Sequence, residues 1–572
     1  MDTSTRLWFF SRTISFVSKA FDFIKDPKPL IRFILATSFA SNEEMGYDLT
    51  VERVKNDAKV WVYDYEVADE DGKSTWYRTV DCLWTHRSGR ISGRGNRVWE
   101  VQELDENRNP AMQKGKPKST CVLKDYWVNC DAIRESAKRN EIIDRALAKN
   151  PGLQRRDIEK HFMTILHDIY VKCHDGNGAL VDDTSEVQLR GWLLPEEYSE
   201  FLLEMPTNNE YTKPQIRNGA RSLTTGASGS TLSTQSSSQH DQPSAPTNPS
   251  RIVPANRVDG PRRHCRTIFR ELGTRLDELT DQRAFIQSLI DALQGLKFLY
   301  DAEYLHCDMS DGNLLWCYDS DHDLMICKTL DLEYARPHLQ SNEENYRPHN
   351  HRTGTPAFMA LEVQANHYLF RSERSVAESD SEEEGDKQME SDGSAPEESS
   401  GVLVAVPFLH NYLHDVEGIW WIMVYHLLST SPNDPQRELS NIEREERIHT
   451  TRVVFPPSPS GSSDRSYFLT VPDRYCAVRE KLPSEYQDLG KALDKVRVLL
   501  KHSYSSLENP SLARVIVHEN YRGLHDKFIA RFKKMKKHAV SSVIKLANIE
   551  EVLQVPKAVE GALEEGKIEH PR

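Results

Sequence analysis

Two long polar segments divide the chain and leave three stretches that can fold. One contains the run SLTTGASGSTLSTQSSSQHDQPSAPTNPS, and the other reads RSERSVAESDSEEEGDKQMESDGSAPEESSG. Both are almost free of large apolar side chains, so neither can bury enough surface to offset the entropy lost on ordering. We therefore predict disordered inserts at 207–260 and 371–401. The sequence then divides into an extension, three folded parts and a flexible end: 1–45, 46–206, 261–370, 402–555 and 556–572.

The charge balance and the apolar runs exclude two classes of partner. The chain has 73 Lys and Arg residues against 87 Asp and Glu residues, a formal net charge of −14. Because nucleic acid and anionic lipid both attract surplus positive charge, we expect no nucleic acid partner and no tight binding to anionic lipid. The apolar run Gly418–Leu428 is far shorter than the roughly 20 residues of a spanning helix, so we expect no membrane span.

The nine cysteines are odd in number and include no C-x-x-C pair. Neither a disulfide framework nor a zinc site follows, and we expect a reducing intracellular compartment, cytoplasmic or nuclear. The N-terminus reads RLWFFSRTISFVSKAFDFI, which is aromatic and mildly basic, but nearby aspartates disfavour a transit peptide. We predict that residues 1–45 form a helical extension that packs on the domain.

The remaining patterns predict strands first and helices later. Strand-like patches stand at 60–67, 98–101 and 121–123, with a long hairpin loop at 103–120. Helix-like stretches follow at 133–148, 157–171, 281–300 and 418–428. In the third, apolar residues recur every three or four positions, and Thr280 or Asp281 can cap its start. This order favours an α+β fold with two lobes and a hinge near 266–273.

A short polar sequence follows the 281–300 helix. His306 is followed by Asp308, and Asn313 stands five residues further on; Asp331 comes eighteen residues after Asn313. Alone, an H-x-D sequence is more often part of a turn. In this order, however, the residues resemble the protein-kinase catalytic loop H-R-D-x-x-x-x-N and the metal-binding Asp of D-F-G.

That resemblance implies a role for each residue. Phosphoryl transfer needs a carboxylate that accepts the proton of the attacking hydroxyl, and oxygen ligands for Mg²⁺. Asp308 would be the proton acceptor, and Asn313 with Asp331 would bind the metal. The implied cofactors are ATP and Mg²⁺.

Upstream residues complete the pattern. Gly93 and Gly95 would let backbone amides approach the phosphates, although a hairpin turn explains them equally well. Lys124, at the end of VLK, would reach the α- and β-phosphates of ATP. Glu141 on the following helix would pair with Lys124, with Glu135 as the rival; a surface salt bridge is the alternative for either.

Two further parts lie downstream in the same order. The segment GTPAFMALE ends in Glu362, which stands in the place of the Glu of A-P-E. Asp415 opens the buried helix and would anchor the catalytic-loop backbone, cap the helix, or do both. The strings GRGNRVW, VLKDYW, HCDMSDGN, DLEYA, GTPAFMALEV and HDVEGIWW resemble the fungal-type protein kinase family over roughly residues 46–430. This implies a two-lobed protein-kinase-like fold with a β-rich N-lobe and a helical C-lobe.

Three departures from the kinase pattern bear on activity. Cys307 replaces the Arg that normally meets a phosphorylated activation loop, and it reads either as a small buried side chain or as a redox-sensitive thiol. Ser310 replaces the catalytic-loop Lys, so the γ-phosphate charge must be met elsewhere. Glu333 replaces the D-F-G glycine, which leaves the metal-binding Asp in place.

The sequence thus predicts an ATP-dependent protein kinase that transfers the γ-phosphoryl group to Ser or Thr hydroxyls of a protein substrate. Two alternatives remain open. One is a catalytically weak pseudokinase scaffold, and the other is a small-molecule phosphotransferase on the same fold, which the peptide-docking segment before Glu362 disfavours. The sequence makes no prediction of the oligomeric state.

Overall fold

The computed structural model describes residues 3–13, 15–42, 44–85, 93–174, 179–184, 261–338, 355–370, 408–434, 439–456, 462–508 and 512–546. The predicted inserts, 207–260 and 371–401, lie outside the described residues. The predicted flexible end, 556–572, lies outside them as well.

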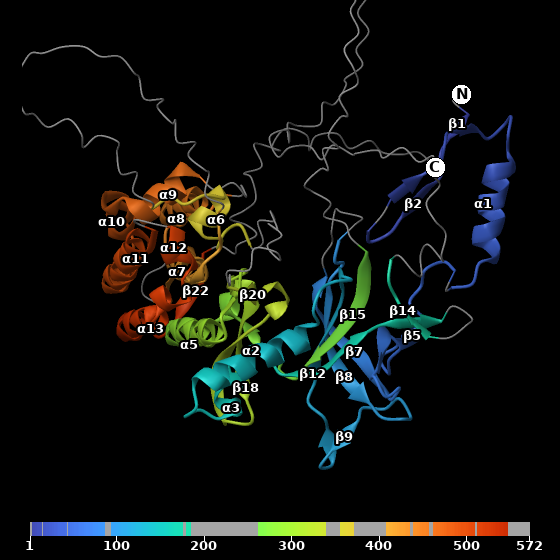
Figure 1. Ribbon diagram of the computed structural model, residues 1–572, viewed down its shortest axis with the longest axis horizontal. Helices are drawn as coiled ribbons and strands as arrows, with labels where there is room; N and C mark the ends of the chain where they lie inside the picture. Colours follow the sequence, from blue (N-terminus) through green and yellow to red (C-terminus); the bar gives the residue numbers. More distant parts are fainter. Residues whose placement is uncertain are drawn as a thin grey trace, which may run out of the picture.

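A seven-stranded antiparallel sheet forms the N-lobe, on the right of Figure 1. Its order is β12-β15-β11-β8-β7-β6-β5. One face buries Tyr65, Val67, Tyr77, Leu123 and Ile268 in a shared apolar cluster. In β6, Tyr65 and Val67 follow the two-residue period of a strand. The strands are β5 (Val51–Lys55), β6 (Trp61–Ala68), β7 (Ser74–Thr85), β8 (Arg97–Leu104), β11 (Cys121–Asn129), β12 (Ile165–Tyr170) and β15 (Arg262–Phe269).

Smaller elements complete the N-lobe. The predicted hairpin loop at 103–120 contains the pair β9 (Met112–Gln113) and β10 (Lys116–Pro117). Another pair is formed by β13 (Lys172–His174) and β14 (Ala179–Val181). Helix α2 (Glu135–Lys149) confirms the helix predicted at 133–148.

The helix predicted at 157–171 is largely wrong. Helix α3 (Arg155–Glu159) ends early, and strand β12 then pairs with β15. The sequence ILHDIY is rich in residues that fit a pleated surface, and the hydrogen bonds supplied by β15 decide between the two states.

Strand β15 also corrects the predicted boundary between the lobes. Arg266 does not lie in a hinge but in the middle of this strand, opposite Asp125 of β11. The chain leaves the sheet only after Phe269 and reaches β16 (Thr274–Arg275) beyond Gly273. A strand that follows a long polar insert thus returns to the sheet that precedes the insert.

The N-terminal extension differs from the single packed helix predicted for residues 1–45. It holds two short antiparallel pairs and one helix, α1 (Lys28–Phe39), which buries none of its residues. The Asp22 side chain accepts hydrogen bonds from the amides of Ile24 and Lys25 and so forms a turn. The strands are β1 (Ser4–Thr5), β2 (Trp8–Phe10), β3 (Ser15–Val17) and β4 (Phe21–Asp22).

The C-lobe is mainly helical and occupies the left of Figure 1. Its helices are α5 (Gln282–Asp301), α6 (Leu361–Ala365), α7 (Tyr412–Ser429), α8 (Asn441–Val454), α9 (Ser463–Thr470), α10 (Pro472–Glu480), α11 (Gln487–Glu508), α12 (Leu512–Ile516) and α13 (Leu524–Met535). Short strands are β17 (Tyr304–Leu305), β18 (Leu314–Asp319), β19 (Leu324–Thr329), β20 (Arg336–Pro337), β21 (Thr430–Pro432) and β22 (Val543–Lys545). Among the described helices, none has both the length and the apolar character needed to cross a bilayer.

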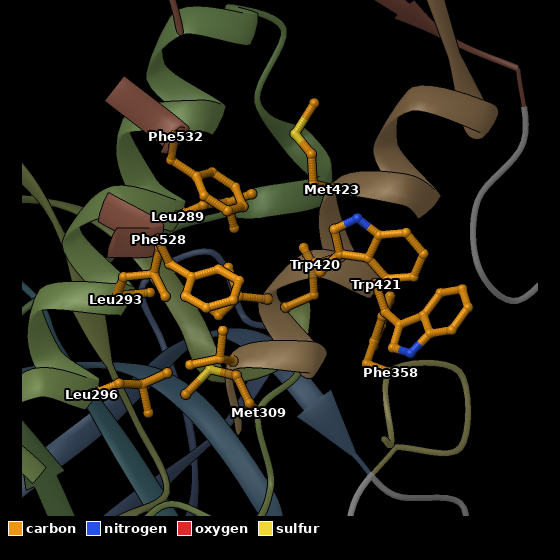
Figure 2. Close-up of a cluster of buried hydrophobic side chains, with 14 of the residues drawn as sticks. Leu289, Leu293, Leu296, Met309, Phe358, Trp420, Trp421, Met423, Phe528 and Phe532 are labelled. Carbon is orange, nitrogen blue, oxygen red and sulfur yellow. The ribbon is translucent and has the colours of Figure 1, made fainter. Parts of the chain in front are cut away.

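Two predicted helices, α5 and α7, form the centre of the C-lobe. Asp281 caps α5 by accepting a hydrogen bond from the Arg283 amide. Figure 2 shows apolar side chains from α5, α7 and α13 packed together, with Met309 from the loop after β17 among them. Helix α7 is buried along its entire length, as its continuous apolar sequence predicts.

Gly418 allows α7 to approach the loop that carries Asp308. A Cβ atom at this position would lie 3.1 Å from both the Cβ and the carbonyl oxygen of Met309. Larger side chains would push the helix away from the loop, so the small residue fixes their separation.

A buried network of charges ties β11 and β15 to the start of the N-lobe. Arg266 donates to Asp125 (3.1 Å) and to Asp48 (2.6 Å). His264 lies between Asp125 (2.8 Å) and Asp182 (3.0 Å). Asp48, Asp125 and His264 place ligand atoms within 4.8 Å of one another, but the Arg266 guanidinium and the His264 ring already supply two positive charges to these carboxylates, so a metal is not needed there.

We predict that this network stabilises the fold less as the pH rises. Burial and Arg266 lower the pKa of His264, but Asp125 and Asp182 outweigh them and raise it to about 9. The unfolded value is about 6.5, so the contribution is complete below about pH 6.5 and is lost as the pH rises through the folded value.

Urea midpoints of the unaltered chain and of His264→Gln test this prediction. They should differ most near pH 6 and converge above about pH 9. The exposed His449→Gln serves as the control. A difference for His264→Gln that does not change with pH would contradict the prediction.

Candidate functional site

Lys124 connects the two lobes. Strand β11 places it in the middle of the sheet, and its side chain is only 7% exposed. Its ammonium nitrogen lies 2.5 Å from an Asp331 oxygen and 3.3 Å from a Glu333 oxygen. Burial alone would lower the pKa of Lys124, but these carboxylates raise it well above the usual value, so the side chain is a cation.

The helix residue beside Lys124 is Glu135, so the assignment of Glu141 is wrong. A Glu135 oxygen lies 3.9 Å from the Lys124 nitrogen. Glu141 instead pairs with Arg145 at 2.7 Å, four residues along α2. Glu141 comes six residues after Glu135, which is about 1.7 helical turns, so the two side chains cannot both face Lys124. Only the start of α2 lies close enough to Lys124.

The catalytic-loop sequence is held by Asp415 at the start of α7. Its two carboxylate oxygens accept hydrogen bonds from the amides of His306 (2.8 Å) and Cys307 (3.0 Å). The expectation that Asp415 anchors this backbone is confirmed. The His306 ring in turn contacts the carbonyl of Leu330 at 2.9 Å, next to Asp331. These bonds fix the loop relative to the turn that carries Asp331.

Asp308 and Asn313 lie together in this loop. The Asn313 amide group donates to the Asp308 carbonyl at 2.7 Å, and the Asn313 carbonyl accepts from the amide of Leu330 at 3.0 Å. The Thr355 amide also donates to Asp308, so the segment before α6 reaches the same place. Asp308, Asn313 and Asp331 therefore belong to one connected group.

The two aspartates have opposite electrostatic surroundings. Burial raises the pKa of Asp308, helped by the neighbouring Asp331. Burial also acts on Asp331, but Lys124 and Arg94 outweigh it and lower the pKa. Asp331 also has a left-handed backbone, with φ of 56°, a conformation that is costly for a non-glycine residue and concentrates at functional sites. One carboxylate is thus disposed to take up a proton and the other to stay ionised.

The predicted glycine pair lies on the loop between β7 and β8. Gly93 has φ of 123°, a conformation open only to glycine, and Gly95 has φ of 58°. The Gly93 amide donates to the Arg12 carbonyl of the N-terminal extension at 3.0 Å, so this amide is already used. The Arg12 guanidinium lies over Gly95, where a Cβ atom would come within 2.5 Å of it.

Two charged residues of the cleft, Arg94 and Lys138, were not predicted. Arg94 stands between the two glycines and forms an ion pair with Glu333, and its guanidinium lies 4.2 Å from the centre of the Tyr334 ring. Lys138 donates to the Glu333 carbonyl at 2.6 Å. The position of Arg94 between two glycines was a signal in the sequence. However, the sequence alone does not predict which way the side chains of a glycine loop point.

Cys307 is a buried side chain with a left-handed backbone, with φ of 67°. Burial raises the pKa of its thiol to about 12, against the opposing effect of the nearby Arg336. A thiol that stays protonated is a poor nucleophile. This favours the interpretation of Cys307 as a small buried residue over a redox-sensitive one.

Glu362 fixes the end of the segment that precedes α7. It accepts from the Leu369 amide at 2.5 Å and contacts the His414 ring at 3.1 Å. The neighbouring Leu361 amide donates to Glu417 of α7 at 2.9 Å. Residues 355–370 are thus fastened to the same helix as the catalytic-loop sequence.

The donor set suits a hard divalent cation. Within the described residues, one oxygen each of Asp308, Glu135 and Glu333 is buried without a hydrogen-bond partner. Asp331 stays ionised, and the Asn313 side chain lies beside Asp308. Carboxylate and amide oxygens are the ligands that Mg²⁺ prefers, together with phosphate oxygens.

A two-lobed α+β fold with this arrangement defines a protein-kinase-like protein. A model of the fungal protein kinase family matches residues 1–427 of the 572. The chain belongs to the fungal protein kinase family, and the predicted fold class is confirmed. That family uses ATP and a divalent metal in general.

Two other comparisons add little detail. Among solved structures, the chain is similar to vaccinia-related kinase 3, with 9% sequence identity and a TM-score of 0.30, over 82% of this chain and 92% of that one. No curated protein sequence matches the chain.

The exchange of Glu141 for Glu135 leads to a first prediction about the site. Glu135→Gln removes the carboxyl group beside Lys124 and should weaken MgATP binding about 10-fold, the effect expected for one lost polar contact to a charged group. Glu141→Gln is the matched control on the same helix and should leave the affinity unchanged. Titration calorimetry measures both, and equal effects of the two variants would contradict the assignment.

The anchoring role of Asp415 leads to a second prediction. Asp415→Asn keeps the shape of the side chain but replaces one acceptor oxygen by a donor that faces a backbone amide. We expect the free energy of unfolding to fall by about 1–3 kcal/mol. Urea denaturation measures it, with the exposed Asp57→Asn as the control. An unchanged midpoint would show that the two amide bonds contribute nothing.

Proposed function

We propose that this protein is an ATP-dependent protein kinase that transfers the γ-phosphoryl group to Ser or Thr hydroxyls of a protein substrate. The contrast between Asp308 and Asp331 is the observation that carries the proposal. Phosphoryl transfer needs one carboxylate to accept a proton and another to hold a metal. Burial and hydrogen bonding supply these two states within one connected group.

The proposed reaction assigns a task to each residue. The substrate hydroxyl oxygen bonds to the γ-phosphorus while its proton passes to Asp308. The bond between the γ-phosphorus and the bridging oxygen breaks, and ADP leaves with that electron pair. Lys124 binds the α- and β-phosphates, and Asn313 with Asp331 binds Mg²⁺. When bound, Mg²⁺ neutralises charge on the phosphate oxygens.

A protein acceptor is favoured by the segment 355–370. Its Glu362 is fastened to α7 through His414, and its Thr355 amide donates to Asp308. A rigid segment at this place gives a peptide a surface beside the proton acceptor. Phosphoamino-acid analysis of phosphorylated protein substrates tests the preference for Ser and Thr over Tyr.

A pseudokinase scaffold is the second candidate, and the contacts across the cleft favour it. Lys124 is bonded directly to Asp331, and Arg94 is paired with Glu333. In this arrangement, protein groups neutralise the charges that a nucleotide and a metal would otherwise meet. Binding of MgATP without turnover by the purified chain would support this candidate over the enzyme.

The compartment is part of the proposal. All nine cysteines lie in the described part of the chain, and no disulfide joins any of them. A reducing intracellular compartment, cytoplasm or nucleus, accords with this usage.

Substitution of the proton acceptor tests the enzyme directly. Asp308→Asn should lower the rate of phosphoryl transfer by about 10²–10⁴-fold, the usual contribution of a positioned acid or base. MgATP binding should be retained because Lys124, Asn313 and Asp331 are unchanged. Radiolabelled phosphate transfer and calorimetry measure the two properties. The exposed Asp321→Asn is the control. Full activity of Asp308→Asn would contradict the assignment of Asp308 as the proton acceptor.

A further inference from the structure

The catalytic-loop sequence contains no lysine or arginine. From His306 to Asn313 it reads HCDMSDGN, and Ser310 stands where the common protein-kinase pattern has a lysine. A γ-phosphate approaching Asp308 would therefore need its positive partner from another element. Charge-assisted contacts are the strongest that a protein offers to phosphate.

Arg94 reaches the cleft from the glycine loop. Its guanidinium pairs with one oxygen of Glu333 and lies over the Tyr334 ring. The Lys124 ammonium group donates to the same Glu333 oxygen at 3.3 Å. Two cations, one from the sheet and one from the loop, thus converge on a single anionic oxygen. A phosphate oxygen bound between a lysine and an arginine has the same surroundings.

Glu333 is an incomplete partner for these cations. Its second oxygen is buried and has no hydrogen-bond partner among the described residues. An ionised oxygen in this situation has lost its water without replacement, which costs free energy. A phosphate group carries more charge than a carboxylate and more acceptor oxygens, and it fits the planar fork of an arginine. A phosphate group would therefore be a stronger partner than Glu333 for these two cations.

We propose that Arg94 binds the γ-phosphate of ATP in exchange for Glu333. This residue supplies the positive charge that the catalytic-loop sequence lacks. The inference rests on the proposed function, because it requires that the cleft bind ATP. Glu333 acts as a competing anion, and the flanking glycines let the loop shift while Arg94 changes partners.

Two roles of Glu333, as a competitor of phosphate and as a ligand of the metal, can be distinguished by experiment. If Glu333 were a metal ligand, its neutralisation would weaken MgATP binding. If it competes with phosphate for Arg94 and Lys124, the same change strengthens binding. The two roles thus predict effects of opposite sign from one variant, Glu333→Gln.

The experiment measures MgATP and MgADP affinities of the full chain by titration calorimetry. Arg94→Met keeps the apolar stem over Tyr334 and removes the charge. We expect it to weaken MgATP binding about 10- to 100-fold and to change MgADP binding much less. Arg97→Met, three residues along the same loop and strand, is the matched control and should show no such selectivity.

Two more variants complete the design. Glu333→Gln should tighten MgATP binding about three- to tenfold. This gain should shrink in the Arg94→Met background, because Arg94 is one of the two cations for which Glu333 and phosphate compete. Arg94→Lys keeps the charge without the planar fork and should recover part of the affinity. Melting temperatures within a few degrees of the unaltered chain confirm that each variant is folded.

The possible failures are distinguishable. Equal MgATP affinity of the unaltered chain and Arg94→Met would overturn the role of Arg94, and weaker binding by Glu333→Gln would overturn the exchange. Either result leaves the proposed function intact. Absence of MgATP binding by the unaltered chain would overturn the proposed function and this inference together.

Discussion

A buried lysine joins carboxylates of both lobes of this protein at one site. Lys124 belongs to the N-lobe sheet, whereas Asp331 and Glu333 belong to the turn that follows β19 in the C-lobe. Glu135, from α2, is a third carboxylate near the same nitrogen. Arg94 pairs with Glu333 and brings a second cation, so two cations face three carboxyl groups. Burial raises the pKa of Glu135, and the charges of Asp331 and Glu333 add to this effect against the opposing charge of Lys124. Carboxyl groups gathered in this way favour a divalent metal.

The rigid side of the cleft comes from the buried helix α7. Asp415 binds two consecutive amides of the catalytic-loop sequence, and Gly418 lets that loop lie against the helix. Met309 extends from the loop into the apolar cluster between α5, α7 and α13 (Figure 2). The position of Asp308 is therefore determined by the packing of the whole C-lobe. A residue that must accept a proton at a defined atom benefits from such support.

The departures from the common kinase pattern form a consistent set. Cys307 is a neutral buried side chain, and the nearby Arg336 belongs to β20 rather than to the loop. Ser310 brings no charge, while Arg94 brings one from the opposite lobe and meets Glu333, the residue that replaces the glycine of D-F-G. In this chain the glycine loop supplies a positive charge, whereas the catalytic-loop sequence contains no lysine or arginine. Such a rearrangement preserves the electrostatic balance of a phosphate-binding cleft although individual positions differ.

The sequence by itself determined the features that depend on local order: the helices α5 and α7, the class of fold, and the grouping of Asp308, Asn313 and Asp331, whose spacing is set by one short stretch of chain. Tertiary structure alone decided which of two glutamates faces Lys124, that β15 returns to the N-lobe sheet, and that Arg94 meets Glu333. These contacts join residues up to 239 positions apart. Periodicity and spacing describe neighbours along the chain, whereas distant partners are selected by packing and by the cost of leaving a buried charge unpaired.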